Sequence, residues 1–435
     1  MPESPNDAVA RSARRKVAWR VLPLLLVSYV IAYLDRANLS FAWLQMRKEL
    51  GFSETVFGVG IALFFIGYLF LEIPGALLVE HWSARKWFAR IMITWGLCSM
   101  GMALVRTPTQ FYVARFLLGL AEAGFFPGVI VYFTHWFPKR DRARALSAML
   151  IGVPISLALG AYASGLLMRE SWFGLSGWQL VFVVEGFPAV LLGIAMPFLL
   201  TDRPHNAKWL TPEERDWLES TLAAERAEAA KTGAITLRAA LRERTVWLLA
   251  LGIFATNTGG YALVFWLPTA VQGLIQATGG DSTPTAVLGW MGIIYLCGFA
   301  GVVISAQSSD RTGDRKWHCV VGQLGAGLFL VLSTLPGQSW PAVFAWLCLT
   351  GFFAYFWIAP FWVLPTLTLT SSAAAVAVGL INMCANLAGA LGSPIFGAMK
   401  DAGLSSGACL TFLAACLALG ALFVALIPVR RAGSP

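Results

Sequence analysis

The sequence predicts an all-α membrane protein with twelve transmembrane helices in two pseudo-symmetric six-helix bundles. The chain has 435 residues, of which 57% are hydrophobic and only 13% are charged, whereas soluble domains carry about a quarter charged residues. Its long apolar runs have about the 20 residues that a helix needs to cross the hydrocarbon. Charged loops separate these runs. The composition excludes a soluble domain, a disordered chain and a disulfide framework.

The apolar runs are expected to be helices, because lipid cannot satisfy unpaired backbone groups. In the first bundle, assigned to residues 1–200, they lie near 18–39, 55–79, 87–105, 109–133, 145–168 and 178–200. In the second bundle, assigned to residues 245–435, they lie near 245–273, 284–308, 317–335, 340–366, 372–398 and 405–428. Residues 201–244 are rich in charge and predict a water-exposed, partly helical linker, with a helix start at Thr211-Pro212.

The basic residues predict the orientation of the chain. With both termini in the cytoplasm, 25 of the 32 Lys and Arg residues fall on the cytoplasmic side and five fall in the outer loops. Cytoplasmic loops carry the excess of positive charge in membrane proteins. The remaining two, Arg36 and Arg115, lie inside predicted helices. The bases therefore form no continuous stripe of the kind that binds nucleic acid.

The two halves carry a related loop. The segment Glu80-His-Trp-Ser-Ala-Arg85-Lys-Trp follows the second predicted helix, and Asp310-Arg311-Thr-Gly313-Asp-Arg315-Lys316-Trp follows the eighth, 230 residues later. One copy alone would indicate ordinary interfacial charge. Two copies at corresponding places indicate duplicated halves, which are typical of transporters that move around a central site.

Several stretches resemble a known family, the major facilitator superfamily, and within it the bacterial anion:cation symporter branch. The Asp310 loop resembles the superfamily's loop motif, and the Glu80 loop is a degraded copy. The segments that resemble the anion:cation symporter branch are Tyr33-Leu-Asp-Arg-Ala-Asn-Leu-Ser-Phe-Ala42, Arg115-Phe-Leu-Leu-Gly-Leu-Ala-Glu-Ala-Gly-Phe-Phe-Pro127, Trp136-Phe-Pro138, Phe265-Trp-Leu-Pro268 and Ile381-Asn-Met-Cys-Ala-Asn386. The resemblance implies proton-coupled uptake of organic anions, and it is nearest to tartrate-transporter-like members.

Six charged residues lie well inside the predicted spans, and all six belong to the first half. They are Asp35, Arg36, Glu72, Arg115, Glu122 and Glu185. Each costs about 2.5–3.5 kcal/mol at the bilayer centre on insertion scales, so each requires a reason. Neighbours on a helix point about 100° apart, so Asp35 and Arg36 need different surroundings. Arg115 and Glu122 are two turns apart on one face, which we expect to meet the first helix across a central cavity.

The resemblance implies roles for four of these residues. Asp35 and Glu122 match the family's proton-carrying acids, Arg36 matches the base linked to the anionic substrate, and Arg115 matches a residue linked to conformational switching. The alternative is a buried ion-pair network that only fixes helix packing. That alternative is about equally favoured for Arg115. Glu72 and Glu185 are expected to be structural.

An anion with hydroxyl groups also requires hydrogen-bonding partners. Tyr33 and Tyr68 match cavity positions of the family. The second half offers candidates for the same cavity: Asn257, Tyr261, Trp362, Asn382 and Asn386. Trp362, between Pro360 and Pro365, is expected in an unwound stretch. The alternatives are core packing for the aromatic residues and helix–helix hydrogen bonding for the asparagines. Ala359 and Phe361 depart from the family pattern and favour a smaller or more apolar cavity.

These patterns predict a proton-coupled importer of a small carboxylate such as tartrate or a sugar acid, in the bilayer of a bacterial inner membrane. It is expected to work as a monomer, without cofactor, metal or nucleic acid. The seven cysteines form no CxxC pair, no nucleotide motif is present, and no nucleophile–base pair suggests an enzyme. An exporter of amphipathic or aromatic carboxylates is the first alternative. A non-transporting sensor is the second.

Overall fold

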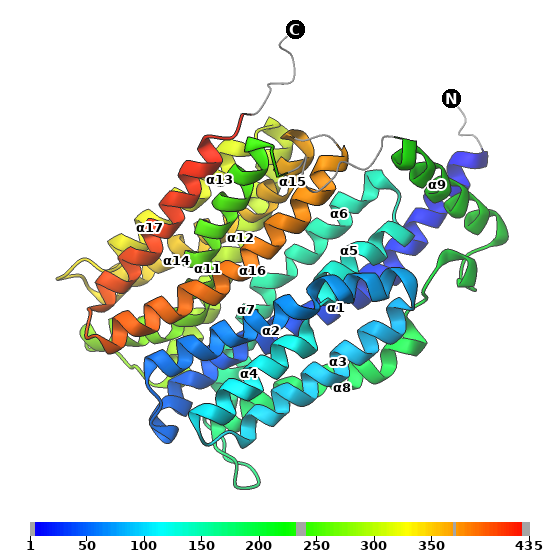
Figure 1. Ribbon diagram of the computed structural model, residues 1–435. Helices are drawn as coiled ribbons and strands as arrows, with labels where there is room; N and C mark the ends of the chain where they lie inside the picture. The colour runs from blue at the N-terminus through cyan, green and yellow to red at the C-terminus, as the bar shows by residue number, and fades with distance from the viewer. Residues whose placement is uncertain (1–4, 232–240, 369–370, 429–435) are drawn as a thin grey trace.

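The computed structural model describes residues 5–231, 241–368 and 371–428, and helices dominate these ranges (Figure 1). The first bundle contains α1 (Pro5–Leu50), α2 (Glu54–His81), α3 (Ala84–Gly101), α4 (Pro108–Glu122), α5 (Phe125–Trp136), α6 (Lys139–Leu150), α7 (Gly152–Leu167) and α8 (Gly177–Leu199). The second contains α11 (Arg244–Ala277), α12 (Pro284–Thr312), α13 (Lys316–Leu332), α14 (Trp340–Phe356), α15 (Ile358–Thr368), α16 (Ser371–Asp401) and α17 (Ser406–Ala425). In the linker, α9 spans Pro212–Lys231.

The all-α membrane fold is confirmed. Within the described ranges, eleven helical spans are long and apolar enough to cross a membrane. The predicted ninth span corresponds to α13, which has 17 residues and is shorter than the others. Serine and threonine side chains cap several of these helices, as Ser53 does for α2 and Ser83 for α3. The loops between spans therefore supply hydrogen bonds that the first helical turns lack.

Three predicted spans are interrupted rather than continuous. The fourth divides into α4 and α5 at Gly124, which has φ of +84° and so adopts a left-handed conformation that glycine tolerates best. A Cβ atom at Gly124 would also lie 2.7 Å from the Cα atom of Gly75. Ile151 separates α6 from α7, and Trp357 separates α14 from α15. The break at Gly124 places Glu122 at the end of α4.

The expectation of an unwound stretch around Trp362 is wrong. Trp362 lies within α15, and the interruption falls earlier, at Trp357. Pro360 is the third residue of α15. The N–H groups in a first helical turn have no partner within the helix, so a proline is tolerated there without unwinding it. The Thr258-Gly259-Gly260 segment, whose two glycines weaken a helix, is contained in the continuous helix α11.

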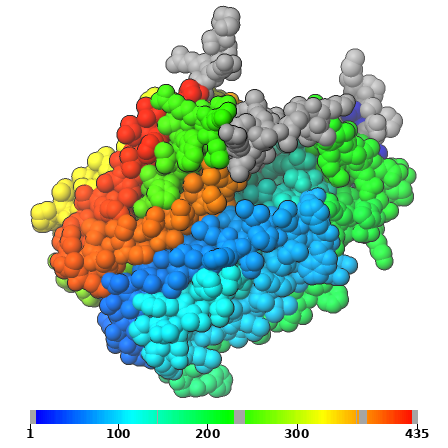
Figure 2. Space-filling view, in the orientation of Figure 1, coloured from blue at the N-terminus to red at the C-terminus, as the bar shows by residue number. Residues whose placement is uncertain are grey.

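The two bundles meet mainly through α2 with α16 and α7 with α12. Figure 1 shows α9, the start of α1 and the end of α17 on one side of the molecule, which we call the linker face. On the opposite face, Arg47 donates to Gln272 at 2.8 Å, and the backbone N–H of Thr55 donates to Asp401 at 2.7 Å. Figure 2 shows the surfaces of α2 and α16 in contact along the front of the molecule. The bundles are therefore joined across the opposite face.

Candidate functional site

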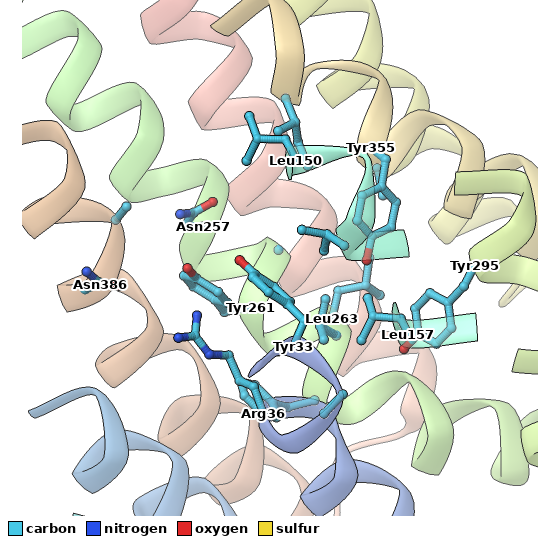
Figure 3. Close-up of a pocket in the computed structure, with 18 of the residues that line it drawn as sticks. Tyr33, Arg36, Leu150, Leu157, Asn257, Tyr261, Leu263, Tyr295, Tyr355 and Asn386 are labelled. Carbon is cyan, nitrogen blue, oxygen red and sulfur yellow. The ribbon is translucent and has the colours of Figure 1, made fainter. Parts of the chain in front are cut away.

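A cavity of about 180 Å³ lies between the two bundles (Figure 3). Nine of the residues predicted to carry function line it. They are Tyr33, Arg36, Tyr68, Glu122, Asn257, Tyr261, Trp362, Asn382 and Asn386. They come from α1, α2 and α4 of the first bundle and from α11, α15 and α16 of the second. The cavity wall is thus shared between both halves, so a relative movement of the bundles changes its shape.

Arg36 is the centre of charge in this cavity. Its guanidinium donates to the Glu122 carboxylate, and both side chains are largely buried. The rings of Tyr33 and Tyr68 lie 5.1 and 5.5 Å from the guanidinium carbon, within the range of cation–π attraction. The Nε of Arg36 has no hydrogen-bond partner. One donor of the guanidinium is therefore unpaired while another is bonded to Glu122.

The side chain of Asp35 contacts α3, whereas that of its neighbour Arg36 lines the cavity. Its Oδ2 accepts a hydrogen bond of 2.9 Å from Trp95 Nε1, and its Oδ1 accepts one of 2.9 Å from Ser99 Oγ. Asn38 donates a further bond of 3.2 Å to Oδ1. Trp95 and Ser99 belong to α3, and Asp35 is not part of the described cavity wall. The predicted divergence of Asp35 and Arg36 follows from their adjacent positions on α1.

Arg115 also lies outside the cavity wall, unlike the shared face expected from its spacing to Glu122. Its guanidinium carbon is 4.7 Å from the centre of the Phe64 ring, and its Nε donates to the Gly60 carbonyl at 3.4 Å. Both contacts are with α2. Its two terminal nitrogens are buried without a hydrogen-bond partner. On the same helix, Glu122 contacts Arg36 of α1, whereas Arg115, two turns earlier, contacts α2.

Glu72 joins the two bundles at the edge of the cavity. This α2 carboxylate accepts hydrogen bonds from the amides of Asn382 and Asn386 on α16, the latter at 3.1 Å. The expected pairing of the two asparagines on one helix face is present, and their common partner is an acid of the other bundle. A structural role for Glu72 thus takes the form of an interbundle contact. Glu185, by contrast, accepts a hydrogen bond of 2.6 Å from Ser164 inside the first bundle.

The cavity residues that the sequence analysis did not name include two tyrosines with unpaired hydroxyl groups. Tyr295 of α12 and Tyr355 of α14 line the cavity, and their phenolic oxygens have no hydrogen-bond partner. Both tyrosines stand within long apolar runs of the sequence. A polar ring in such a run was the available signal, but in this chain aromatic residues in spans usually form core packing. Only the three-dimensional arrangement distinguishes them.

The paired loop motifs form different contacts on the linker face. In the second half, Arg315 pairs with Asp310 at 2.6 Å, and Lys316 donates to the Ile427 carbonyl at 2.9 Å. Gly313 ends α12 with φ of +70°, and Arg311 lies in the last turn of that helix. In the first half, Glu80 contacts His135 at 2.7 Å, and Arg85 contacts Asp202 at 3.2 Å. The copies share their position but not their partners.

A cavity shared by two helical bundles, with a buried ion pair in its wall, defines a multi-pass membrane transporter. Residues 25–393 match the family model of the Major Facilitator Superfamily. The chain belongs to this superfamily. Within the described ranges, no group of three or more metal-ligating side chains is present.

Relatives of the chain are similar along nearly its whole length. It is 41% identical to a protein of Agrobacterium vitis named "Putative tartrate transporter", over 98% of this chain and 97% of the relative. It is 37% identical to a "Quinolone resistance transporter" of Acinetobacter baumannii, over 93% of this chain and 92% of that protein. The solved structure of the xylose transporter XylE from E. coli matches with a TM-score of 0.72, at 16% identity over 97% of this chain and all of that one. This last likeness concerns the fold alone.

Proposed function

We propose that this chain is a monomeric symporter that carries a small organic anion together with protons into the cell, by alternating access, across a bacterial inner membrane. The observation that carries the proposal is the Arg36–Glu122 pair in the wall of the cavity between the bundles. A carboxylate substrate and the Glu122 carboxylate compete for the same cation. Protonation of Glu122 releases Arg36 to the substrate, so anion binding and proton binding are linked.

Further features support the assignment. Arg36 is the only basic residue among those described in the cavity wall, which favours an anionic ligand. Asp35, buried against α3 with three hydrogen-bond donors and no cation in contact, provides a second proton-carrying group. The name of the Agrobacterium relative suggests tartrate as the first anion to test.

The proposal predicts the behaviour of reconstituted protein. In proteoliposomes, an inward proton gradient should drive accumulation of a labelled carboxylate, and Asp35→Asn and Glu122→Gln should each abolish accumulation against a gradient while exchange of substrate across the membrane persists. Glu185→Gln is the matched control, because it replaces a buried acid of the same bundle that bonds to Ser164 and has no assigned role in proton transfer. Full proton-driven accumulation by both variants would refute the proton assignment.

An exporter of amphipathic or aromatic carboxylates is a second candidate, favoured by the name of the Acinetobacter relative and by the aromatic cavity wall. The two functions differ in direction. An exporter would reduce the labelled carboxylate content of cells under a proton gradient, whereas the proposed importer would raise it. Ligand binding without flux in either direction would instead indicate a sensor.

A further inference from the structure

Two unpaired phenols lie in the wall of the cavity. The side chains of Tyr295 and Tyr355 are 2% and 7% exposed, and neither phenolic oxygen has a hydrogen-bond partner. A buried hydroxyl without a partner loses the hydrogen bonds that it makes in water, which is unfavourable. Both residues line the same cavity as Arg36. A bound molecule that exchanges hydrogen bonds with them would recover that cost.

The phenols and the cation occupy different parts of the cavity. Figure 3 shows Arg36, Tyr33 and Tyr261 on one side and Tyr295 and Tyr355 on the other. In the same view, Leu157 of α7 and Leu263 of α11 lie between the two groups, and both belong to the cavity wall. The cavity thus has a cationic end, an apolar middle and a phenolic end.

This arrangement disfavours small polyhydroxylated dianions. A second carboxylate would find no second cation among the described wall residues. Each amide of Asn382 and Asn386 already uses one of its two N–H donors on Glu72. Hydroxyl groups that reach the apolar middle of the cavity would face Leu157 and Leu263 and lose their hydrogen bonds to water.

We propose, on the basis of the function proposed above, that the preferred substrates are aromatic monocarboxylates with a hydrogen-bonding substituent opposite the carboxylate. The carboxylate binds Arg36, the ring lies between Leu157 and Leu263, and the substituent exchanges hydrogen bonds with Tyr295 and Tyr355. A cavity of about 150 Å³ lined by apolar side chains accepts benzene. The volume of about 180 Å³ in this chain therefore suits a single substituted ring.

The test uses the purified full-length protein and four probes: 4-hydroxybenzoate, benzoate, L-tartrate and D-gluconate. We expect 4-hydroxybenzoate to bind most tightly and benzoate next. Tyr295→Phe and Tyr355→Phe each remove one hydroxyl and keep the ring, so each should weaken 4-hydroxybenzoate binding by about three- to tenfold and leave benzoate binding within twofold. Tyr162→Phe, on an exposed position of α7, is the control and should change neither affinity.

The outcomes separate this inference from the proposed function. Tighter binding of tartrate or gluconate than of both benzoates would overturn the inference and leave the function of anion transport standing. An unchanged ratio of 4-hydroxybenzoate to benzoate affinity in both phenylalanine variants would also overturn it, because the phenols would then not contact the substituent. Absence of binding and of proton-driven accumulation for all four probes would refute both proposals.

Discussion

The guanidinium of Arg36 on α1 donates a hydrogen bond to the carboxylate of Glu122 at the end of α4, inside the cavity between the bundles. Each residue is the nearest opposite charge described for the other. Breaking a buried pair by removing one partner leaves an uncompensated charge, which is costly. A substrate carboxylate that takes the place of Glu122 avoids this cost, provided that Glu122 is neutral at that moment.

Replacing Arg36 with lysine should reduce the free energy of carboxylate binding more than it reduces the free energy of unfolding. Lysine keeps the positive charge but lacks the planar fork of donors that fits a carboxylate. A hydrogen bond to a charged group contributes about 1.5–3 kcal/mol, so we expect affinity for the best-bound anion to fall by about 10- to 100-fold. Equilibrium binding to the purified variant measures this. Arg106→Lys, in the loop before α4, is the control, and equal losses in both variants would contradict a specific role for Arg36.

The contact between Glu72 and the α16 asparagines should be a coupled unit. Glu72→Leu leaves the Asn382 and Asn386 amides without their acceptor and should lower the free energy of unfolding by about 1–3 kcal/mol. The double variant Glu72→Leu/Asn386→Leu should lose less free energy of unfolding than the sum of the losses in the two single variants. The difference should be at least about 0.5 kcal/mol. Thermal unfolding of the four proteins in one detergent measures the cycle. Simple additivity would mean that the bond does not contribute in solution.

A larger residue at Gly58 should open the face opposite the linker. A Cβ atom at this α2 position would lie 2.6 Å from the Ser393 carbonyl of α16, so a leucine cannot fit while the helices stay in contact. We expect Gly58→Leu to raise hydrogen exchange at the start of α2 and to reduce transport. Gly289→Leu is the control, because no atom lies within 4 Å of a Cβ atom there. Unchanged exchange in Gly58→Leu would show that this face is already open in solution.

Gly119 should be intolerant of even one methyl group. A Cβ atom there would lie 2.1 Å from the Phe64 carbonyl oxygen, and this backbone cannot move without shifting α2. Overpacking of this kind typically costs about 1–3 kcal/mol. Gly119→Ala should therefore lower thermal stability, and it should also weaken anion binding because α4 carries Glu122. Gly101→Ala, in open space, should do neither; a stable Gly119→Ala would contradict the close packing of α2 and α4.

The spans and the cavity were accessible to sequence reasoning because lipid imposes simple rules on length and charge. Apolar runs of membrane length located the helices, and the rule that intramembrane polar residues require partners led to Arg36, Glu122 and the α16 asparagines. The resemblance added Tyr33 and Tyr68. These residues do line one cavity.

What the sequence did not predict depends on rotation and contact between helices. Arg115 and Glu122 lie seven residues apart on the continuous helix α4, but Arg115 contacts α2 and Glu122 contacts α1. Spacing along one helix does not predict which neighbouring helix each side chain meets. The partner of Glu72 lies more than 300 residues away, on α16. Tyr295 and Tyr355 resemble core residues until their unpaired hydroxyls are placed beside the cavity.

The most direct test of the account is the pH dependence of anion affinity in the wild-type protein and in Glu122→Gln, measured by equilibrium binding of 4-hydroxybenzoate and of L-tartrate. If the substrate and the ionised Glu122 compete for Arg36, the wild-type dissociation constant should rise with pH by up to about tenfold per unit once Glu122 ionises. The glutamine variant should bind at every pH about as tightly as the wild type at low pH. An equally steep pH dependence in both proteins would contradict the claim that Glu122 and the substrate share Arg36.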